Sequence, residues 1–269
     1  MTRFAWIVLL GALAAGCAGT GSVDIPTDVP ELRPGILQGY LPPEALPDSA
    51  ALLPPPPEPE SAAMARDREA MEAALALQGT PRWEQARADA VLRFPAAVRS
   101  FSCALGAPIT EEATPNLYML LRRSLADLGL STYGAKNRYR RTRPFMVNEQ
   151  PTCTPDDEEA LRADGSYPSG HAAIGWGWAL ILAELAPERA DALLARGRDF
   201  AESRVICNVH WSSDVAEGRN VGAAAVARLH GDPVFRAQLE QARGEVADAP
   251  AGGATQDVDC AADEAATGG

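Results

Sequence analysis

Residues 172–186, with the sequence AAIGWGWALILAELA, constrain the fold of this chain more than any other segment. If they form a helix, apolar side chains cover nearly all of its faces, and a helix that is hydrophobic all round has to be buried by its neighbours. The segments at 60–78 and 82–94 carry apolar residues at three- and four-residue spacing, which is typical of helices that could surround it. We therefore predict an all-α fold, a single-domain helical bundle around a central apolar helix.

The two ends of the chain differ in composition from this helical region. We assign residues 51–243 to one folded domain, since 269 residues with 46% hydrophobic content are enough for one sizeable core. Residues 18–50 are rich in proline and glycine and are interpreted as a tether followed by an irregular arm. Residues 244–269, which are mainly alanine, glycine and acidic residues, are predicted to be a disordered acidic tail.

The first 17 residues indicate export. Residues 1–17 contain Arg3 and then an apolar run of about a dozen residues, which is too short to span a bilayer and is typical of a signal peptide. Gly16 and Cys17 resemble the end of a bacterial lipobox, although the usual leucine lies one position too far upstream. Two alternatives stay open. Lipidation of Cys17 would give an outer-membrane lipoprotein, and ordinary cleavage would give a freely soluble protein in the periplasm or outside the cell.

The five cysteines fit an exported chain. Removing Cys17 leaves an even number, Cys103, Cys153, Cys207 and Cys260, in an oxidising compartment. Four cysteines allow three pairings, of which we favour Cys153–Cys207 and Cys103–Cys260. The alternative is that these residues are free buried thiols.

Three short stretches contain side chains suited to phosphate chemistry: KNRYRRTRP (136–144), PSGH (168–171) and SRVICNVHWSSD (203–214). They hold the single lysine of the chain, Lys136, and two of its three histidines. An ammonium and a guanidinium are different means of holding an oxyanion. One lysine in an arginine-rich chain, close to Arg143, therefore points to a phosphate-binding site.

The candidate phosphate-binding residues are Lys136, Arg143, Arg204, Ser169 and Gly170. Hydrolysis of a monoester needs several fixed donors, because charge spreads over the equatorial oxygens in the transition state. PSGH directly precedes the predicted central helix, whose unpaired N–H groups and dipole favour an anion. Gly170 would let the backbone approach that anion closely.

The two histidines in these stretches are candidates for the nucleophile and the acid, and no cluster of metal ligands is evident from the sequence. His210 and Asp214 lie four residues apart, one helical turn, so the carboxylate can accept from one ring nitrogen and direct the other at phosphorus. We predict His210 as the nucleophile, Asp214 as the residue that orients it, and His171 as the general acid and later the base. His171 has to be protonated to act as the acid, so we expect activity to be highest at acidic pH.

In their order and spacing, K-x6-RP, PSGH and SR-x5-H-x3-D resemble the signature of the type 2 phosphatidic acid phosphatase superfamily, which is shared with vanadium haloperoxidases. ALLPPPP (51–57), GSYPSGHAAIGWGWALILAE (165–184) and SRVICNVHWSSDV (203–215) are more specifically similar to bacterial class A non-specific acid phosphatases, and the similarity covers roughly residues 45–243. The resemblance implies an acid phosphatase/vanadium haloperoxidase-like fold, a metal-independent reaction through a phosphohistidine, broad monoester specificity and self-association into a homo-oligomer. The residue roles that it implies agree with those given above.

These observations predict an exported acid phosphatase that acts on small phosphomonoesters without a cofactor, with phosphate transfer to alcohols as a side reaction. A formal charge of −12 argues against a nucleic-acid partner. Two alternatives remain, a vanadate-dependent haloperoxidase and a catalytically dead phosphate-binding lipoprotein. Outside the site, we expect Arg138 and Arg141 to be solvated and His230 to be structural, while Trp211 is either a core residue or part of the pocket lining.

Overall fold

The computed structural model describes residues 23–249 and residue 260. The predicted signal peptide, its candidate lipidation site Cys17 and most of the predicted tail lie outside these residues. Two short antiparallel strands, β1 (Glu31–Arg33) and β2 (Ile36–Leu37), form a hairpin in the arm, and the all-α prediction is otherwise confirmed. The helices are α1 (Ser49–Leu52), α2 (Ala62–Leu75), α3 (Pro81–Asp89), α4 (Arg99–Leu105), α5 (Pro115–Leu130), α6 (Tyr133–Tyr139), α7 (Phe145–Asn148), α8 (Glu158–Ala163), α9 (Gly170–Leu185), α10 (Ala190–Ile206), α11 (Ser212–Leu229) and α12 (Pro233–Asp248).

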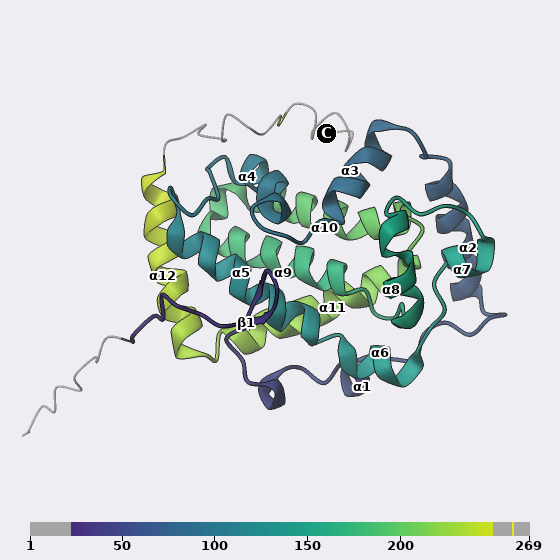
Figure 1. Cartoon of the computed structure of the whole chain (residues 1–269), viewed down its shortest axis with the longest axis horizontal. Coiled ribbons are helices and arrows are strands. Elements are labelled where there is room, and N and C mark those ends of the chain that lie inside the picture. Colours follow the sequence, from purple (N-terminus) through teal and green to yellow (C-terminus); the bar gives the residue numbers. More distant parts are fainter. Residues whose placement is uncertain (1–22, 250–259, 261–269) are drawn as a thin grey trace, which may run out of the picture.

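Helix α9 is the central helix that the sequence predicts. It packs against α5, α10 and α11, and in Figure 1 it runs through the middle of the bundle. Trp178, Ile181 and Leu182 of this helix are fully buried, so its all-round apolar pattern reflects cover by its neighbours. Among the described residues, neither α9 nor any other helix combines the length and the hydropathy needed to cross a membrane.

Trp178 joins the central helix to the elements around it. Its ring centroid lies 5.7 Å from that of Phe94, 6.0 Å from that of Phe101 and 6.3 Å from that of Phe200. Its Nε1 donates a hydrogen bond to the Leu121 carbonyl oxygen of α5 at 3.1 Å, so the indole N–H is paired although it is buried. This cluster therefore ties α4, α5 and α10 to α9.

Helix α12 continues to Asp248, beyond the predicted end of the helical domain. The carboxylate of Glu245 accepts hydrogen bonds at 2.9 Å from the backbone amides of Asn116 and Leu117, in the first turn of α5. The N-terminal amides of a helix have no partner within that helix, and an acidic side chain is favourable there. The last turn of α12 therefore belongs to the folded domain, and the predicted boundary of the tail falls too early.

Both favoured cysteine pairs are disulfide-bonded, and the alternative of free thiols is wrong. Cys103 pairs with Cys260 across a Cα–Cα distance of 5.5 Å, and Cys153 pairs with Cys207 across 4.8 Å. The first disulfide fixes residue 260 to α4. The second joins the segment between α7 and α8 to the C-terminal end of α10.

Candidate active site

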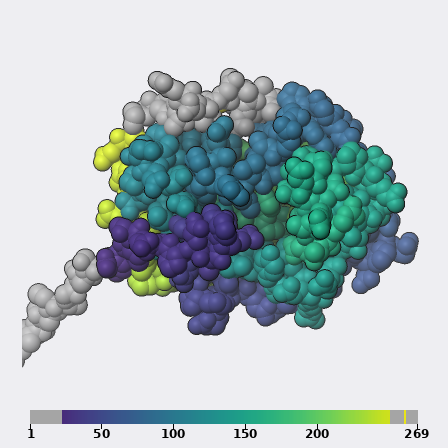
Figure 2. Space-filling model, in the orientation of Figure 1, coloured from purple at the N-terminus to yellow at the C-terminus, as the bar shows by residue number. Residues whose placement is uncertain are grey.

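The three motifs meet around one cavity of about 290 Å³. In Figure 2 the surface is hollowed between the N-terminal hairpin and the region of α8, two of the elements that line this cavity. The predicted site residues that line it are Lys136 of α6, Arg143 of the loop before α7, Gly170 and His171 of α9, and His210 of the loop between α10 and α11. The helical bundle thus brings together residues that are up to 74 positions apart in the sequence.

His210 is held between a carboxylate and a guanidinium. Its Nδ1 lies 3.4 Å from Asp214 Oδ2, and its Nε2 lies 3.1 Å from Arg143 Nη1. Because a guanidinium can only donate, we assign Nε2 as the acceptor and place the ring proton on Nδ1, which faces the carboxylate. Asp214 Oδ2 also accepts a hydrogen bond from the Trp211 amide at 2.9 Å, which holds the carboxylate in place. The arrangement leaves Nε2 of the neutral ring unprotonated.

Burial and the nearby cations favour the neutral form of both histidines. The pKa of His210 lies well below its ordinary value, first because of burial and then because of Arg143, Lys136 and Arg204. The pKa of His171 is also lowered well below its ordinary value, by burial and then by Arg204. A neutral imidazole is the form that can act as a nucleophile, so these shifts suit the role predicted for His210.

The surroundings of His171 refine its predicted role. Its Nε2 lies 3.1 Å from the carbonyl oxygen of Ala90. A carbonyl oxygen can only accept, so Nε2 carries a proton and Nδ1 is the nitrogen that gains or loses one. The lowered pKa opposes a protonated His171 in the protein alone. A bound phosphate would offset the effect of Arg204, so the proton would be taken up together with the anion.

Arg204, in the last turn of α10, is a buried cation with unpaired atoms. The residue is 1% exposed, and its Nε and Nη1 have no hydrogen-bond partner in the part of the chain that the structure describes. Burial, and then Arg143, lowers the pKa of Arg204 to about 10, so the guanidinium is still charged at neutral pH. An unpaired buried charge is costly, and this cation lies close enough to influence both His171 and His210. It is therefore suited to hold an anion beside the two histidines.

Lys136 and Arg143 are held by the segment at the end of α8. Lys136 Nζ contacts Asp164 Oδ2 at 3.0 Å and donates to the Gly165 carbonyl oxygen. Arg143 Nε donates to the carbonyl oxygens of Leu161 and Asp164 at 2.8 and 3.1 Å, and Nη2 contacts Asp164 Oδ2 at 3.2 Å. Burial, and then Arg143, lowers the pKa of Lys136 to about 8. Asp164 also lines the cavity, and it is not predictable from the sequence because it belongs to none of the three motifs.

The PSGH loop is fixed by α11. The Ser169 amide donates to the Asp214 carbonyl oxygen at 2.9 Å, and the buried Ser169 hydroxyl caps α9 by accepting from the Ala172 amide at 3.3 Å. Gly218 of α11 permits this close approach, since a Cβ there would lie 2.5 Å from the Ser169 carbonyl oxygen. Helix α11 therefore positions both the Asp214 carboxylate and the loop that brings Gly170 to the cavity.

The prediction that Arg141 is a solvated residue is wrong. Its side chain is 9% exposed and forms ion pairs with Asp67 of α2 at 2.7 Å and with Asp214 at 2.5 Å. The chain adopts a left-handed backbone conformation at Arg140, with φ of 44°, at the point where it leaves α6 and turns toward α2 and α11. Arg141 therefore supplies the positive charge that balances the carboxylate facing His210.

Other residues outside the motifs have simpler roles. Trp211 is buried, and its Nε1 donates to the Thr142 carbonyl oxygen at 2.9 Å, which makes it a packing residue under Arg141. Arg138 is exposed, as predicted. His230 Nε2 lies 3.0 Å from Glu184 Oε2, in agreement with the structural role expected for it.

The N-terminal hairpin forms part of the cavity wall. Leu32, Arg33 and Ile36 line the cavity, although their sequence predicts an irregular arm outside the domain. Strand β1 is exposed along its length, so its residues show no alternation of buried and exposed positions that could identify it. Strand β2, whose Leu37 is buried, packs on α5, and this packing brings the hairpin to the site.

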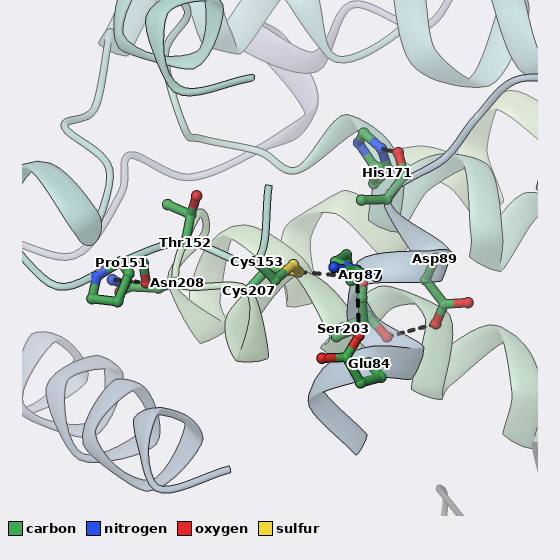
Figure 3. The surroundings of a disulfide bond; sticks show 12 residues. Glu84, Arg87, Asp89, Pro151, Thr152, Cys153, His171, Ser203, Cys207 and Asn208 are labelled. Carbon is green, nitrogen blue, oxygen red and sulfur yellow. Dashed lines mark hydrogen bonds and ion pairs between the residues drawn. A yellow bond between two sulfur atoms is a disulfide. The ribbon is translucent and has the colours of Figure 1, made fainter. Parts of the chain in front are cut away.

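The Cys153–Cys207 disulfide supports the turn that carries His210. Cys207 is the residue that directly follows α10, shortly before His210, and Figure 3 shows it beside Cys153. Asn208 lies on the same turn and donates from its side-chain amide to the Pro151 carbonyl oxygen at 3.4 Å. A disulfide and a hydrogen bond thus connect this turn to the segment before α8.

Comparisons with known proteins identify relatives of this chain. The PAP2 superfamily model matches residues 117–236. The chain is 46% identical over 209 residues to the non-specific acid phosphatase of Providencia stuartii, an alignment that covers 77% of this chain and 84% of that protein. It is 44% identical over 213 residues to the non-specific acid phosphatase of Salmonella typhimurium, and the alignment covers 79% of this chain and 85% of that protein. It is 40% identical over 199 residues to an acid phosphatase of Zymomonas mobilis, and the alignment covers 74% of this chain and 75% of that protein. The chain therefore belongs to the PAP2 superfamily and, within it, to the bacterial class A non-specific acid phosphatases.

Proposed function

We propose that this acid phosphatase hydrolyses a broad range of small phosphate monoesters, without a metal ion, through a phosphohistidine on Nε2 of His210. The observation that carries the proposal is the arrangement of the His210 ring, with Nδ1 at 3.4 Å from Asp214 and an unprotonated Nε2 at 3.1 Å from Arg143. Lys136, Arg143 and Arg204 would neutralise the phosphoryl oxygens, whose charge is spread out in the transition state.

The first step transfers the phosphoryl group to the protein. Nε2 of His210 attacks phosphorus, the N–P bond forms, and the P–O bond to the leaving group breaks. Arg143 exchanges its hydrogen bond to Nε2 for one to a phosphoryl oxygen. His171 gives a proton to the departing oxygen, so the product leaves as an alcohol. Asp214 stabilises the positive charge of the phosphorylated ring through Nδ1–H.

The second step regenerates the protein. His171 takes a proton from a water molecule, whose oxygen attacks phosphorus, and the N–P bond breaks to release inorganic phosphate. An alcohol in place of water would accept the same phosphoryl group and give a new monoester, so we include phosphate transfer as a side reaction. Glycerol added to the assay tests this, because glycerol phosphate should form at the expense of inorganic phosphate.

We also propose that the protein is exported. Its two disulfides support this, because such bonds persist mainly in oxidising compartments. The N-terminal signal peptide would be removed. In one form cleavage would precede Cys17, whose lipid would attach the mature protein to the outer membrane, and in the other form the mature protein would be soluble. Mass spectrometry of the mature N-terminus distinguishes the two forms.

One pair of measurements tests the proposed chemistry. The first is release of p-nitrophenol from p-nitrophenyl phosphate by wild type and His210→Ala, with and without EDTA. In the second, the protein is mixed with ³²P-labelled substrate and quenched in alkaline denaturant, since an N–P bond to histidine is labile in acid. We expect turnover that EDTA does not change, loss of turnover in the variant, and label on residue 210. Rapid turnover with no label at that position would overturn the phosphohistidine, and loss of turnover in EDTA would overturn metal independence.

A further inference from the structure

Asp164 places a negative charge among the cations of the site. It directly follows α8 and lines the cavity, and its side chain is 34% exposed. One carboxylate oxygen, Oδ2, contacts both Lys136 Nζ at 3.0 Å and Arg143 Nη2 at 3.2 Å. The carboxylate therefore takes up donors from two of the three cations to which phosphate binding is assigned above.

The third cation is in a different situation. No carboxylate lies within 4.0 Å of the Arg204 guanidinium among the described residues, and two of its nitrogen atoms have no hydrogen-bond partner there. A phosphoryl group would thus meet unpaired donors on Arg204. At Lys136 and Arg143 the phosphoryl group would have to share donors with the Asp164 carboxylate or displace it. The N–H groups that contact this carboxylate are also suited to a phosphate oxygen.

The carboxylate of Asp164 is not needed to hold the two cations in place. The Arg143 guanidinium also donates to the carbonyl oxygens of Leu161 and Val209 at 2.8 and 2.9 Å, and to the backbone carbonyl oxygen of Asp164 itself at 3.1 Å. Lys136 Nζ also donates to a backbone carbonyl, that of Gly165. These bonds do not depend on the charge at position 164, so a neutral side chain there would leave both cations anchored.

We propose that Asp164 is a built-in competitor for phosphate, whose carboxylate pairs with Lys136 and Arg143 and has to yield these donors when a phosphoryl group binds. The proposal rests on the proposed function only in that Lys136 and Arg143 bind phosphate. Competition weakens the binding of inorganic phosphate as well as substrate, and it therefore limits inhibition by the product. A residue that instead positioned the two cations would have the opposite effect, since its loss would weaken phosphate binding.

The test compares Asp164→Asn with Asp156→Asn. Both substitutions remove one negative charge and nearly conserve side-chain volume, but Asp156 lies in the exposed 3₁₀ turn Pro155–Asp157 and does not line the cavity. The inhibition constant for inorganic phosphate is measured against p-nitrophenyl phosphate at fixed ionic strength. We expect Asp164→Asn to lower this constant roughly tenfold and to lower KM as well, because a partly exposed carboxylate that faces two cations is lost. Asp156→Asn should leave both values unchanged.

Calorimetric titration of inorganic phosphate into His210→Ala, with and without Asp164→Asn, measures the same effect where no turnover occurs. An unchanged or higher inhibition constant and dissociation constant in Asp164→Asn would overturn the proposal. Lys136→Met is the control for the site itself. If it leaves phosphate binding unchanged, the assignment of Lys136 to the phosphate site fails. If it weakens binding while Asp164→Asn has no effect, only the role of Asp164 fails.

Discussion

Replacing Gly218 with alanine should displace the PSGH loop without altering any residue that lines the cavity. A Cβ at position 218 would lie 2.5 Å from the Ser169 carbonyl oxygen and 2.9 Å from the Ala172 Cβ. Ordinary contact begins at 3.4 Å, so the two helices would have to separate by about 0.9 Å at this point. The atom that has to move belongs to backbone, which cannot rotate away as a flexible side chain can.

Gly222, one turn further along α11, offers a matched control. A Cβ at position 222 would lie 2.5 Å from the Ala173 carbonyl oxygen, the same separation as at position 218. Ala173 is one helical turn beyond Ser169 and does not line the cavity. The two substitutions therefore introduce a similar steric conflict between α11 and α9, at the PSGH loop in one case and away from it in the other.

The two variants should lose similar stability but different amounts of activity. Overpacking by a methyl group costs about 1–3 kcal/mol, partly offset by the roughly 1 kcal/mol by which alanine is favoured over glycine in a helix. A displacement of about 1 Å at a reacting centre costs up to roughly 10²-fold in rate. We therefore expect kcat/KM to fall by about 10- to 100-fold in Gly218→Ala and much less in Gly222→Ala.

Thermal unfolding and hydrolysis of p-nitrophenyl phosphate provide the two readouts. Activity is measured well below both unfolding transitions, so that loss of folded protein does not contribute. The reasoning would be refuted if Gly218→Ala kept wild-type kcat/KM despite a lower Tm. It would equally be refuted if the two folded variants lost activity to the same extent.

The structure supports four further predictions. Arg204→Met should lower kcat/KM by roughly 10²–10³-fold and yet raise Tm, because it removes a proposed phosphate donor and also a buried guanidinium whose Nε and Nη1 have no hydrogen-bond partner among the described residues. A lower Tm in this variant would contradict the cost assigned to burying this charge. Since the pKa of Lys136 is lowered to about 8, its charge is lost as pH rises through that value, and kcat/KM should fall over the same range. In Lys136→Arg, which keeps its charge, this decline should disappear from the pH profile, and an unchanged profile would show that another group causes it. His171→Ala should lower kcat/KM by roughly 10²–10⁴-fold for alkyl phosphates but by less for p-nitrophenyl phosphate, because its leaving group needs no proton. Equal losses of kcat/KM for the two substrates would count against the acid role of His171. Reduction of the Cys153–Cys207 disulfide, which spans 54 residues, should lower the free energy of unfolding by about 4 kcal/mol. Denaturant titrations of the double variant Cys103→Ser/Cys260→Ser, which lacks the other disulfide, measure this effect by itself. A change below about 1 kcal/mol would refute the prediction.

Local spacing explains which parts of the site can be predicted from the sequence. His210 and Asp214 are four residues apart across the start of α11, so their contact follows from the geometry of a helix start. The all-round apolar pattern of α9 similarly determines that it is buried. In both cases the information lies within a single short segment.

The parts that could not be predicted depend on contacts between distant segments. Arg141 meets Asp67, which lies 74 positions earlier, and nothing in a basic loop shows which carboxylate a given arginine will reach. Asp164 lies 28 positions after Lys136 and is one of several acidic residues around α8, so its place beside Lys136 and Arg143 becomes visible only in three dimensions. The hairpin was missed for a similar reason, because only its packing on α5 brings Leu32 to the cavity.

That hairpin would make the site sensitive to any cleavage near the N-terminus of the domain. Leu32, Arg33 and Ile36 form a removable part of the cavity wall, because they precede the whole helical domain. Two proteolytic products of one precursor, cut on either side of this hairpin, would share every residue assigned to catalysis. They would still differ in how the alcohol portion of a substrate is enclosed, so trimming of the N-terminus would alter selectivity without a change in the gene.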